Sequence, residues 1–306
     1  MAEGRGRPSP LPMKSSARST ASSPEVRRGA GGFALFLAIG LAVAASPPPP
    51  SPGPLLLAAR PFLPKDSVYR APFVAGETLV YGLDWLGIEG GEMTLSASRE
   101  TSSDGIGLHR LVLTAESNAV VSTFYPVRTR YETWVDVRDF QPVRFEKHAR
   151  EGRYESDEVE EFDLTQRVGS WREKRTALPD RVEDLISSFY FLRTQPLVPG
   201  EAVQVDVYSR GNIYKLSAAV LGRERVETGA GTFETFKVQP QLRESETGED
   251  RNRGKLLLWF SDDDRRLPVM ARTVLGIGAV TARLKSVTPP GPTLAPPAPA
   301  APPAPG

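Results

Sequence analysis

The chain has 306 residues, of which 40% are hydrophobic and 25% are charged, a composition typical of a soluble globular protein. The net charge is +1, but residues 1–45 hold six basic and two acidic residues, which leaves 32 basic and 35 acidic residues for the remainder. This mildly acidic remainder lacks the clustered basic surface that nucleic-acid binding requires, and the absence of cysteine excludes disulfides, thiol catalysis and cysteine-ligated metals.

The N-terminal segment has the layout of a secretory signal. Arg27 and Arg28 precede an apolar run of thirteen residues, from Phe33 to Ala45, whose last residues are small enough for signal-peptide cleavage. As a helix this run would span only about 20 Å, less than the ~30 Å hydrocarbon core of a bilayer. We therefore expect residues 1–45 to be a signal peptide, with an uncleaved N-terminal anchor as the alternative.

This segment predicts an exported protein that is periplasmic or associated with the cell envelope. Membrane contact is expected only through the N-terminal segment, if that segment is kept. Because the chain contains no cysteine, it offers no acceptor for the acyl chain of a bacterial lipoprotein, and we expect it not to be one.

Proline-rich segments flank the body of the chain. Residues 46–68 predict an extended linker, and residues 288–306, which are mostly Pro and Ala, predict a disordered tail. The residues between them, 69–287, suffice for a single β-rich domain.

Apolar residues recur with a period of two in this domain, which predicts half-buried strands. Near the start of the domain one such face carries Leu79, Tyr81, Leu83 and Trp85; a later one carries Thr129, Tyr131, Thr133, Val135 and Val137. Turn signals rich in Gly, Asp and Ser separate the strands at intervals of about ten residues, which is typical of an antiparallel meander. A sheet of about ten strands must curl, so we expect a mostly all-β fold, with the meander forming a barrel or half-barrel.

One stretch breaks the alternation and predicts a helix near 180–194. Apolar residues recur there at helical intervals, Asp180 is placed as an N-cap, and Glu183 stands three residues later as in a capping box. Pro196 would end the helix. Leu185, Ile186 and Phe189 are expected to be buried.

The chain repeats a phrase on either side of this helix. "PFVAGETLVYGLDW" begins at Pro72 and "PLVPGEAVQVDVYS" begins at Pro196, 124 positions later. Trp134 and Trp259, 125 positions apart, each precede an acidic turn and a Pro-Val pair. These echoes predict two duplicated halves, 72–178 and 196–287. The alternative is that strand starts and proline-bearing hairpin turns look alike in any β protein.

The sequence offers little material for catalysis. It contains two histidines and no cysteine, which leaves almost no basis for a zinc site or a Ser-His-Asp triad. We expect His148 on a solvated strand face and His109 at a strand edge or in the core. The acidic runs at 157–163 and 261–266 are interpreted as a charged strand face or loop and as a charged hairpin turn. We expect a protein that is not an enzyme and that uses no cofactor and no metal.

Aromatic side chains are the most suggestive group for binding. They gather around the first half of the sheet and the helix, where they would line an apolar ligand site. The four residues placed in such a lining are Tyr81, Trp85, Phe189 and Tyr190. Ordinary core packing is the alternative reading of the same residues.

Three stretches resemble the bacterial domain-of-unknown-function family 3108. The first spans 76–95 and shares a Gly-Glu, aromatic, Trp-Leu-Gly and Gly-Gly pattern that includes Gly90 and Gly91. The second is the predicted helix, with Asp184, Ser187, Tyr190 and Arg193. The third spans 258–284 and shares a Trp, acidic-turn, Leu-Pro-Val and late Gly pattern. The resemblance implies an exported bacterial envelope protein and supplies no activity and no catalytic residues.

Three functions remain open. The first is a non-catalytic envelope protein that binds a lipid or other apolar small molecule inside the curved sheet. The second is an envelope assembly or adaptor protein that contacts other proteins through strand edges and the proline-rich tail. A hydrolase that uses paired carboxylates is the third, and no motif supports it.

Overall fold

The computed structural model describes residues 71, 73–85, 87–103, 105–245, 255–275 and 278–288. The predicted signal segment and linker lie outside these residues, as does the tail from residue 289 onward. Thr288, which we expected to begin the tail, is instead the last residue of a strand. Within the described part of the chain, no helix has the length and apolar character needed to span a membrane.

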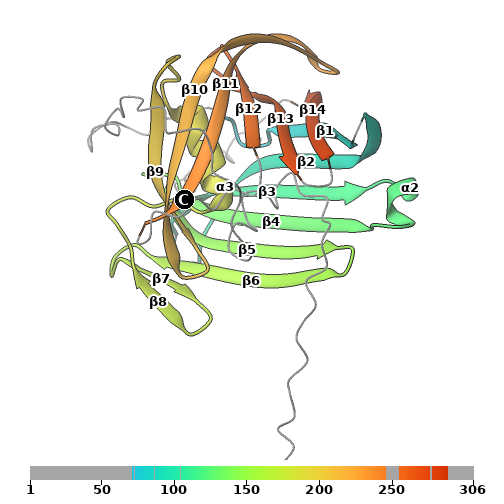
Figure 1. The fold of residues 1–306 in the computed structure, drawn as a ribbon. Helices are drawn as coiled ribbons and strands as arrows, with labels where there is room; N and C mark the ends of the chain where they lie inside the picture. The colour runs from blue at the N-terminus through green and yellow to red at the C-terminus, as the bar shows by residue number, and fades with distance from the viewer. Residues whose placement is uncertain are drawn as a thin grey trace, which may run out of the picture. The chain divides into compact units, whose positions relative to one another are not determined.

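The described residues form fourteen strands and two helices (Figure 1). The strands are β1 (Thr78–Trp85), β2 (Ile88–Thr101), β3 (Gly107–Ser117), β4 (Val127–Asp136), β5 (Pro142–Glu151), β6 (Tyr154–Asp163), β7 (Val168–Trp171), β8 (Lys174–Ala177), β9 (Ala202–Ser209), β10 (Asn212–Thr228), β11 (Gly231–Glu244), β12 (Lys255–Ser261), β13 (Pro268–Leu275) and β14 (Gly278–Thr288). The helices are α2 (Ala119–Ser122), which was not expected, and α3 (Leu185–Thr194).

All fourteen strands belong to one antiparallel sheet. Strands that are neighbours in sequence pair with each other, except β8 with β9. β1 also pairs with β14, so the order runs from β8 through β1 and β14 to β9. The strands change direction along the sheet between β3–β6 and β9–β14, and α3 lies between these two groups (Figure 1). The predicted fold class is therefore confirmed, with fourteen strands rather than about ten. The curled sheet is not closed by pairing, because β8 and β9 remain its two edges.

Helix α3 begins later than the sequence predicted. Glu183 is extended and pairs in parallel with Val207 of β9: its N–H donates to the Asp206 carbonyl at 2.9 Å and its carbonyl accepts from the Tyr208 N–H at 2.8 Å. The placement of the N-cap at Asp180 is therefore wrong. Asp184 caps the helix instead, through hydrogen bonds from the backbone N–H groups of Ile186 and Ser187.

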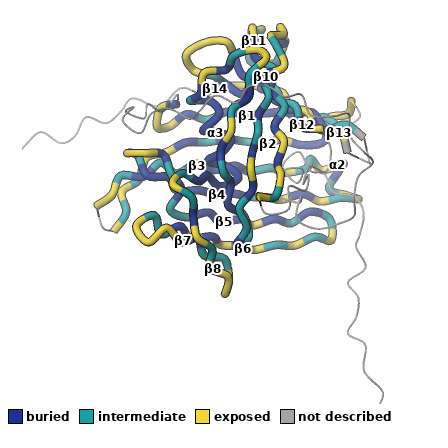
Figure 2. The backbone as a smooth tube through the Cα atoms, turned by 60° about the vertical axis from the view of Figure 1, so that its left-hand side comes forward, coloured by how far each residue is buried: buried dark blue, intermediate teal, exposed yellow. Residues whose placement is uncertain are grey.

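The helix is buried on every side. Each residue from Leu185 to Arg193 is buried, and α3 lies against β3, β4 and β9. Along the strands, by contrast, buried and less buried residues alternate, as Figure 2 shows for β3–β6. The curled sheet thus packs one face inward against α3 and leaves the other face toward water.

The two repeated phrases fold alike. Gly76 and Gly200 have positive φ angles of 96° and 88°, a region that glycine adopts without strain. Their N–H groups donate to the carbonyls of Ala97 at 2.7 Å and Val220 at 2.9 Å. The following residues, Glu77 and Glu201, close the same turn in both places. Each phrase is therefore a tight turn that starts a strand, β1 in one case and β9 in the other.

The two tryptophan echoes also make matching contacts. The indole N–H of Trp134 donates to Glu100 at 3.1 Å, and that of Trp259 donates to Glu224 at 3.2 Å. In the first half Arg110 stacks over the indole and pairs with the same glutamate. In the second half Lys237 does both. The strands from β1 to β5 thus correspond in order to those from β9 to β13, and duplication of an ancestral half stays a prediction.

Gly91 is expected to be a position where even alanine is costly. A β-carbon there would lie 2.1 Å from the Glu116 carbonyl oxygen and 2.9 Å from the Ser117 Cα, both backbone atoms of β3. We expect Gly91→Ala to lower the free energy of unfolding by about 1–3 kcal/mol, measured by urea denaturation. Gly82→Ala is the matched control, because the three atoms nearest to its β-carbon would belong to the flexible Lys285 side chain, the nearest at 3.2 Å. Equal stability of the two variants would contradict the close approach of β2 and β3.

Candidate functional site

The structure brings together three of the four aromatic residues predicted to line a ligand site. The rings of Phe189 and Tyr190 lie 6.1 Å apart, and Phe189 also packs 5.7 Å from Phe260. Tyr81 is buried nearby on β1 and its hydroxyl donates to the Pro268 carbonyl at 2.7 Å. These residues belong to the packed apolar core, and a role in ligand binding stays a prediction for them.

Trp85 occupies a different position from the other three residues. It ends β1, opposite Ile88 of β2 and Val280 of β14, and is only half-buried against the edge of the core. Of the four predicted residues, Tyr81, Phe189 and Tyr190 therefore form one apolar group at α3, and Trp85 lies apart from them at the end of β1.

A buried ion pair joins α3 to the start of β1. The Arg193 guanidinium donates to both carboxylate oxygens of Glu77, at 2.7 and 3.2 Å, and to the Arg265 carbonyl at 3.0 Å. Arg193 is 1% exposed and Glu77 is 6% exposed. Arg193 also lies over the ring of Tyr190 at 5.3 Å. This buried pair fixes the helix to the sheet.

A second group of polar side chains lies on the inner face of β4–β6 and on the β9–β10 turn. We call it the polar inner cluster: Tyr131, Lys147, Glu151, Tyr154, Glu158 and Arg210. Tyr131, Lys147, Glu151 and Glu158 are buried. They alternate with outward residues and share their strand faces with core residues such as Phe145 and Phe162. Charge therefore occupies positions that elsewhere in the sheet are apolar.

Lys147 stands at the centre of this cluster. Its ammonium group donates to the Tyr154 hydroxyl at 3.3 Å and lies 4.0 Å from the nearer Glu158 oxygen. It also lies 5.7 Å from the ring centroid of Tyr131 and 5.4 Å from that of Tyr154. Two aromatic faces thus stabilise a buried cation that forms one hydrogen bond with the described residues.

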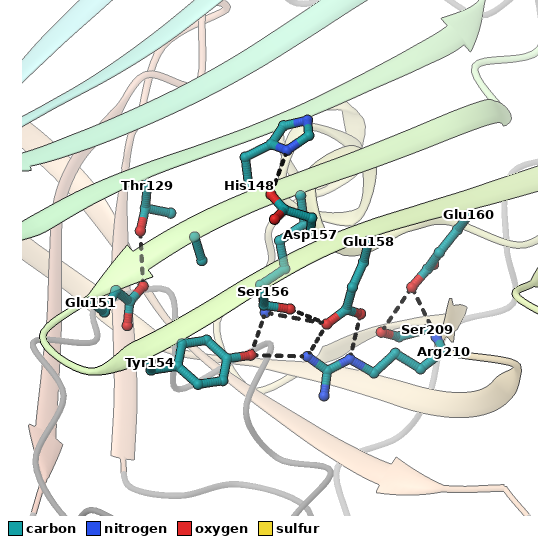
Figure 3. A network of polar contacts seen from close by, with 12 residues as sticks. Thr129, His148, Glu151, Tyr154, Ser156, Asp157, Glu158, Glu160, Ser209 and Arg210 are labelled. Carbon is teal, nitrogen blue, oxygen red and sulfur yellow. Dashed lines mark hydrogen bonds and ion pairs between the residues drawn. The ribbon is translucent and has the colours of Figure 1, made fainter.

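Glu158 and Arg210 are paired through two hydrogen bonds. Arg210 donates from Nε to one carboxylate oxygen and from Nη2 to the other, both at 2.6 Å, and a further bond reaches the Tyr154 hydroxyl at 3.3 Å (Figure 3). Burial alone would raise the pKa of Glu158, but the hydrogen bonds from Arg210 and Ser156 outweigh it and lower that pKa. Glu158 is therefore an ionised carboxylate with both oxygens engaged.

The β9–β10 turn is hydrogen-bonded to β6 and β8, although the edge strands β8 and β9 do not pair with each other. Glu160 of β6 accepts from the backbone N–H of Arg210 at 2.8 Å (Figure 3). Thr176 of β8 donates to the Gly211 carbonyl at 2.7 Å, and Lys174 donates to Asn212 at 2.6 Å. We call this set of contacts the seam.

Three buried acids lie along the seam and at the start of α3. Burial is the main cause that raises the pKa of Glu160 to about 8, of Glu183 to about 8 and of Asp184 to about 6. The charge of Asp184 raises the pKa values of both glutamates further. Glu160 and Glu183 therefore keep their protons to a higher pH than exposed glutamates do.

Two polar atoms in the polar inner cluster are buried and have no partner among the described residues. They are the Tyr131 hydroxyl and the Glu151 Oε2 atom; the other Glu151 oxygen accepts from Thr129 at 3.0 Å. Burial raises the pKa of both side chains. A buried polar atom without a hydrogen bond costs free energy.

The described residues contain no group of three His, Cys, Asp or Glu side chains arranged to hold a metal ion. His148 lies on the outer face, 2.9 Å from Asp157, as the alternation predicted (Figure 3). His109 packs edge-on against Phe73 at 5.1 Å, and its pKa is lowered by burial. Neither histidine faces the polar inner cluster.

Sequence reasoning missed the polar inner cluster, although a signal was present. Lys147 has the same parity as Phe145 and Ala149, and Glu158 has the same parity as Phe162. The run at 157–163 was interpreted as a charged strand face or loop. It is a strand with acidic residues on both faces, exposed on one and buried on the other.

Comparison with known families and structures gives one sequence match and several distant structural ones. The family described as "Protein of unknown function (DUF3108)" matches residues 78–285. No curated protein matches the chain significantly. Among solved structures, a β-barrel-like protein of DUF1849 from Brucella abortus is 8% identical, with a TM-score of 0.46, covering 70% of this chain and 98% of its own.

Two further structures are similar at lower scores. A protein from Parabacteroides distasonis, described as a lipoprotein, is 13% identical with a TM-score of 0.32, over 73% of this chain and 100% of its own. A protein from Bacteroides fragilis, described as exported and YmcC-like in fold, is 13% identical with a TM-score of 0.29, over 72% of this chain and 100% of its own.

Proposed function

The chain belongs to the DUF3108 family, and from that premise we propose that it is an exported bacterial envelope protein that binds an amphipathic lipid-like molecule without transforming it. Export is supported by the basic residues, apolar run and small residues of the N-terminal 45 positions. The proposed ligand binds on the inner face of the curled sheet.

The observation that carries the proposal is the pair of unpartnered buried atoms in the polar inner cluster, the Tyr131 hydroxyl and Glu151 Oε2. The inner face is apolar on β1–β3 and β11–β14, whereas on β4–β6 apolar residues such as Phe145 and Phe162 share it with the polar inner cluster. A molecule with one apolar and one polar part suits a face divided in this way.

Binding is favoured over hydrolysis by the state of the carboxylates. Glu158 is held by Arg210 through both oxygens, which leaves neither oxygen free to act as a general base. Glu160 accepts a hydrogen bond from the Arg210 backbone N–H at the seam. We therefore propose that the protein is not an enzyme and needs no cofactor.

Mass spectrometry of material released from the protein tests this function. The secreted form, purified natively from envelope extracts, is expected to carry a stoichiometric small molecule and to begin near residue 46. Lys147→Met is expected to lose that molecule, because the variant removes the buried cation at the centre of the cluster. Lys237→Met is the matched control, since Lys237 also stacks on an aromatic ring but lies on the outer face.

An empty wild-type protein, or a ligand that both lysine variants retain equally, would overturn binding at the polar inner cluster. Circular dichroism of each variant establishes that it is folded before the bound material is compared.

A second candidate, an adaptor that contacts another envelope protein, is favoured by exposed apolar side chains near α2. Val120 is 70% exposed, Phe124 is 62% exposed and Ile88 of β2 is 67% exposed. Asn118 joins α2 to β2 by donating to the Glu89 carbonyl at 2.7 Å. Crosslinking from Phe124 in intact cells would capture a partner if this surface is an interface.

A further inference from the structure

We propose that the polar inner cluster binds a neutral polyhydroxylated group, such as the glycerol or sugar portion of a lipid. This inference rests on the proposed binding function and narrows it to one chemical class of headgroup. It is carried by the charge balance of the cluster and by the hydrogen-bonding capacity that its side chains leave unused.

The charges of the cluster are balanced in two pairs. Arg210 and Glu158 neutralise each other through their double hydrogen bond. Lys147 and Glu151 are the remaining cation and acid, close enough for Lys147 to lower the pKa of Glu151 against the effect of burial. An anionic headgroup beside Lys147 would also meet two acidic side chains, and a cationic one would meet Lys147 and Arg210. Burial makes either mismatch costly, so a neutral group is preferred.

The unused donors and acceptors match hydroxyl groups. Glu151 Oε2 can only accept when ionised, Lys147 can only donate, and the Tyr131 hydroxyl can do either. A hydroxyl group donates one hydrogen bond and accepts two, so a pair of neighbouring hydroxyls can donate to Glu151 and accept from Lys147. A carboxylate or phosphodiester could accept from Lys147 but, having no O–H group, would leave an ionised Glu151 Oε2 without a donor.

Removing the Tyr131 hydroxyl distinguishes a role in ligand binding from a role in protein stability. Because it has no partner among the described residues, Tyr131→Phe removes an unpaired buried polar group and should leave the melting temperature of the empty protein unchanged or raised. Tyr81→Phe is the matched control: its hydroxyl is equally buried but donates to the Pro268 carbonyl, so its loss should lower the melting temperature.

Isothermal titration calorimetry tests the headgroup with two probes that share one acyl chain and a third that has none. The first two are monolaurin, whose head is a glycerol diol, and lauric acid at neutral pH. The third is free glycerol. Wild-type protein is expected to bind monolaurin at least about tenfold more tightly than laurate. Tyr131→Phe should weaken monolaurin binding roughly three- to tenfold, the loss of one hydrogen bond, and leave laurate binding unchanged. Tyr208→Phe removes the hydroxyl of a buried tyrosine outside the cluster and should leave the ratio of the two affinities unchanged.

The remaining outcomes separate this inference from the function on which it rests. Glycerol binding as tight as monolaurin binding supports the same chemistry with a free polyol as its source. Laurate binding as tight as monolaurin, or no effect of Tyr131→Phe, overturns the headgroup assignment. Wild-type protein that carries a native ligand yet binds none of the probes overturns the headgroup alone. Protein that is empty when purified and binds no probe overturns both.

Discussion

Replacing Arg193 with methionine is expected to lower the free energy of unfolding by about 3–5 kcal/mol, because it leaves the Glu77 carboxylate buried without its partner. Arg193 donates to both Glu77 oxygens and to the Arg265 carbonyl, and it is 1% exposed. Desolvation of an uncompensated charge is the main source of the loss. Urea denaturation at pH 7 measures it.

Two controls identify the cause of that loss. The double variant Arg193→Met with Glu77→Leu should recover most of the stability, since it replaces the whole ion pair by apolar side chains. Arg283→Met breaks an exposed pair with Asp84, 2.8 Å apart, and should cost no more than about 1 kcal/mol. If Arg193→Met costs no more than Arg283→Met, the ion pair does not fix α3 to the sheet.

The protein is expected to lose stability as pH rises from about 4.5 to about 8, and Glu160→Gln should remove a large part of that loss. The pKa of Glu160 is about 8 in the folded protein against a model-compound value of 4.5. The folded state therefore binds the proton more tightly than the unfolded chain does. The contribution of Glu160 to stability is fully present below pH 4.5, the pKa of the unfolded chain, and is lost as pH rises toward the folded-state pKa of about 8.

Melting temperature measured from pH 5 to pH 9 checks this expectation. Glutamine keeps an oxygen that can accept from the Arg210 N–H but cannot ionise, so Glu160→Gln should be more stable than wild type at pH 9 and similar at pH 5. Glu161→Gln is the control, because Glu161 faces solvent beside Arg144. The melting temperature of Glu160→Gln should still decrease somewhat as pH rises, because the pKa values of the buried Glu183 and Asp184 are also raised. A wild-type profile that rises with pH over this range would contradict the burial of Glu160.

The strands could be predicted from the sequence because their signals are local. Alternation and glycine turns fixed the faces of β1 and β4 correctly, and the charged turn at 261–266 is a hairpin as expected. The start of α3 could not be predicted in the same way. Asp180 and Glu183 form a plausible local cap, but pairing of Glu183 with β9 keeps that segment extended, and β9 lies beyond the helix in sequence.

The candidate site was only partly predictable for a similar reason. The aromatic group was found because apolar residues at regular spacing are expected inside. Lys147, Glu151 and Glu158 were not singled out as part of a site, because charged residues rarely lie inside without a partner. Arg210, the partner of Glu158, stands 52 positions away on a hairpin turn, and no local pattern connects the two.

Among the described strands, only one of the thirteen pairings joins strands that are distant in sequence, and it lies in the middle of the sheet: Thr78 of β1 faces Thr288 of β14. All other pairings are hairpins, which form quickly because their loops are short. Two meanders, β1–β8 and β9–β14, can therefore assemble separately. A single closure of a loop of about 200 residues then unites them, at an entropic cost that grows only slowly with loop length.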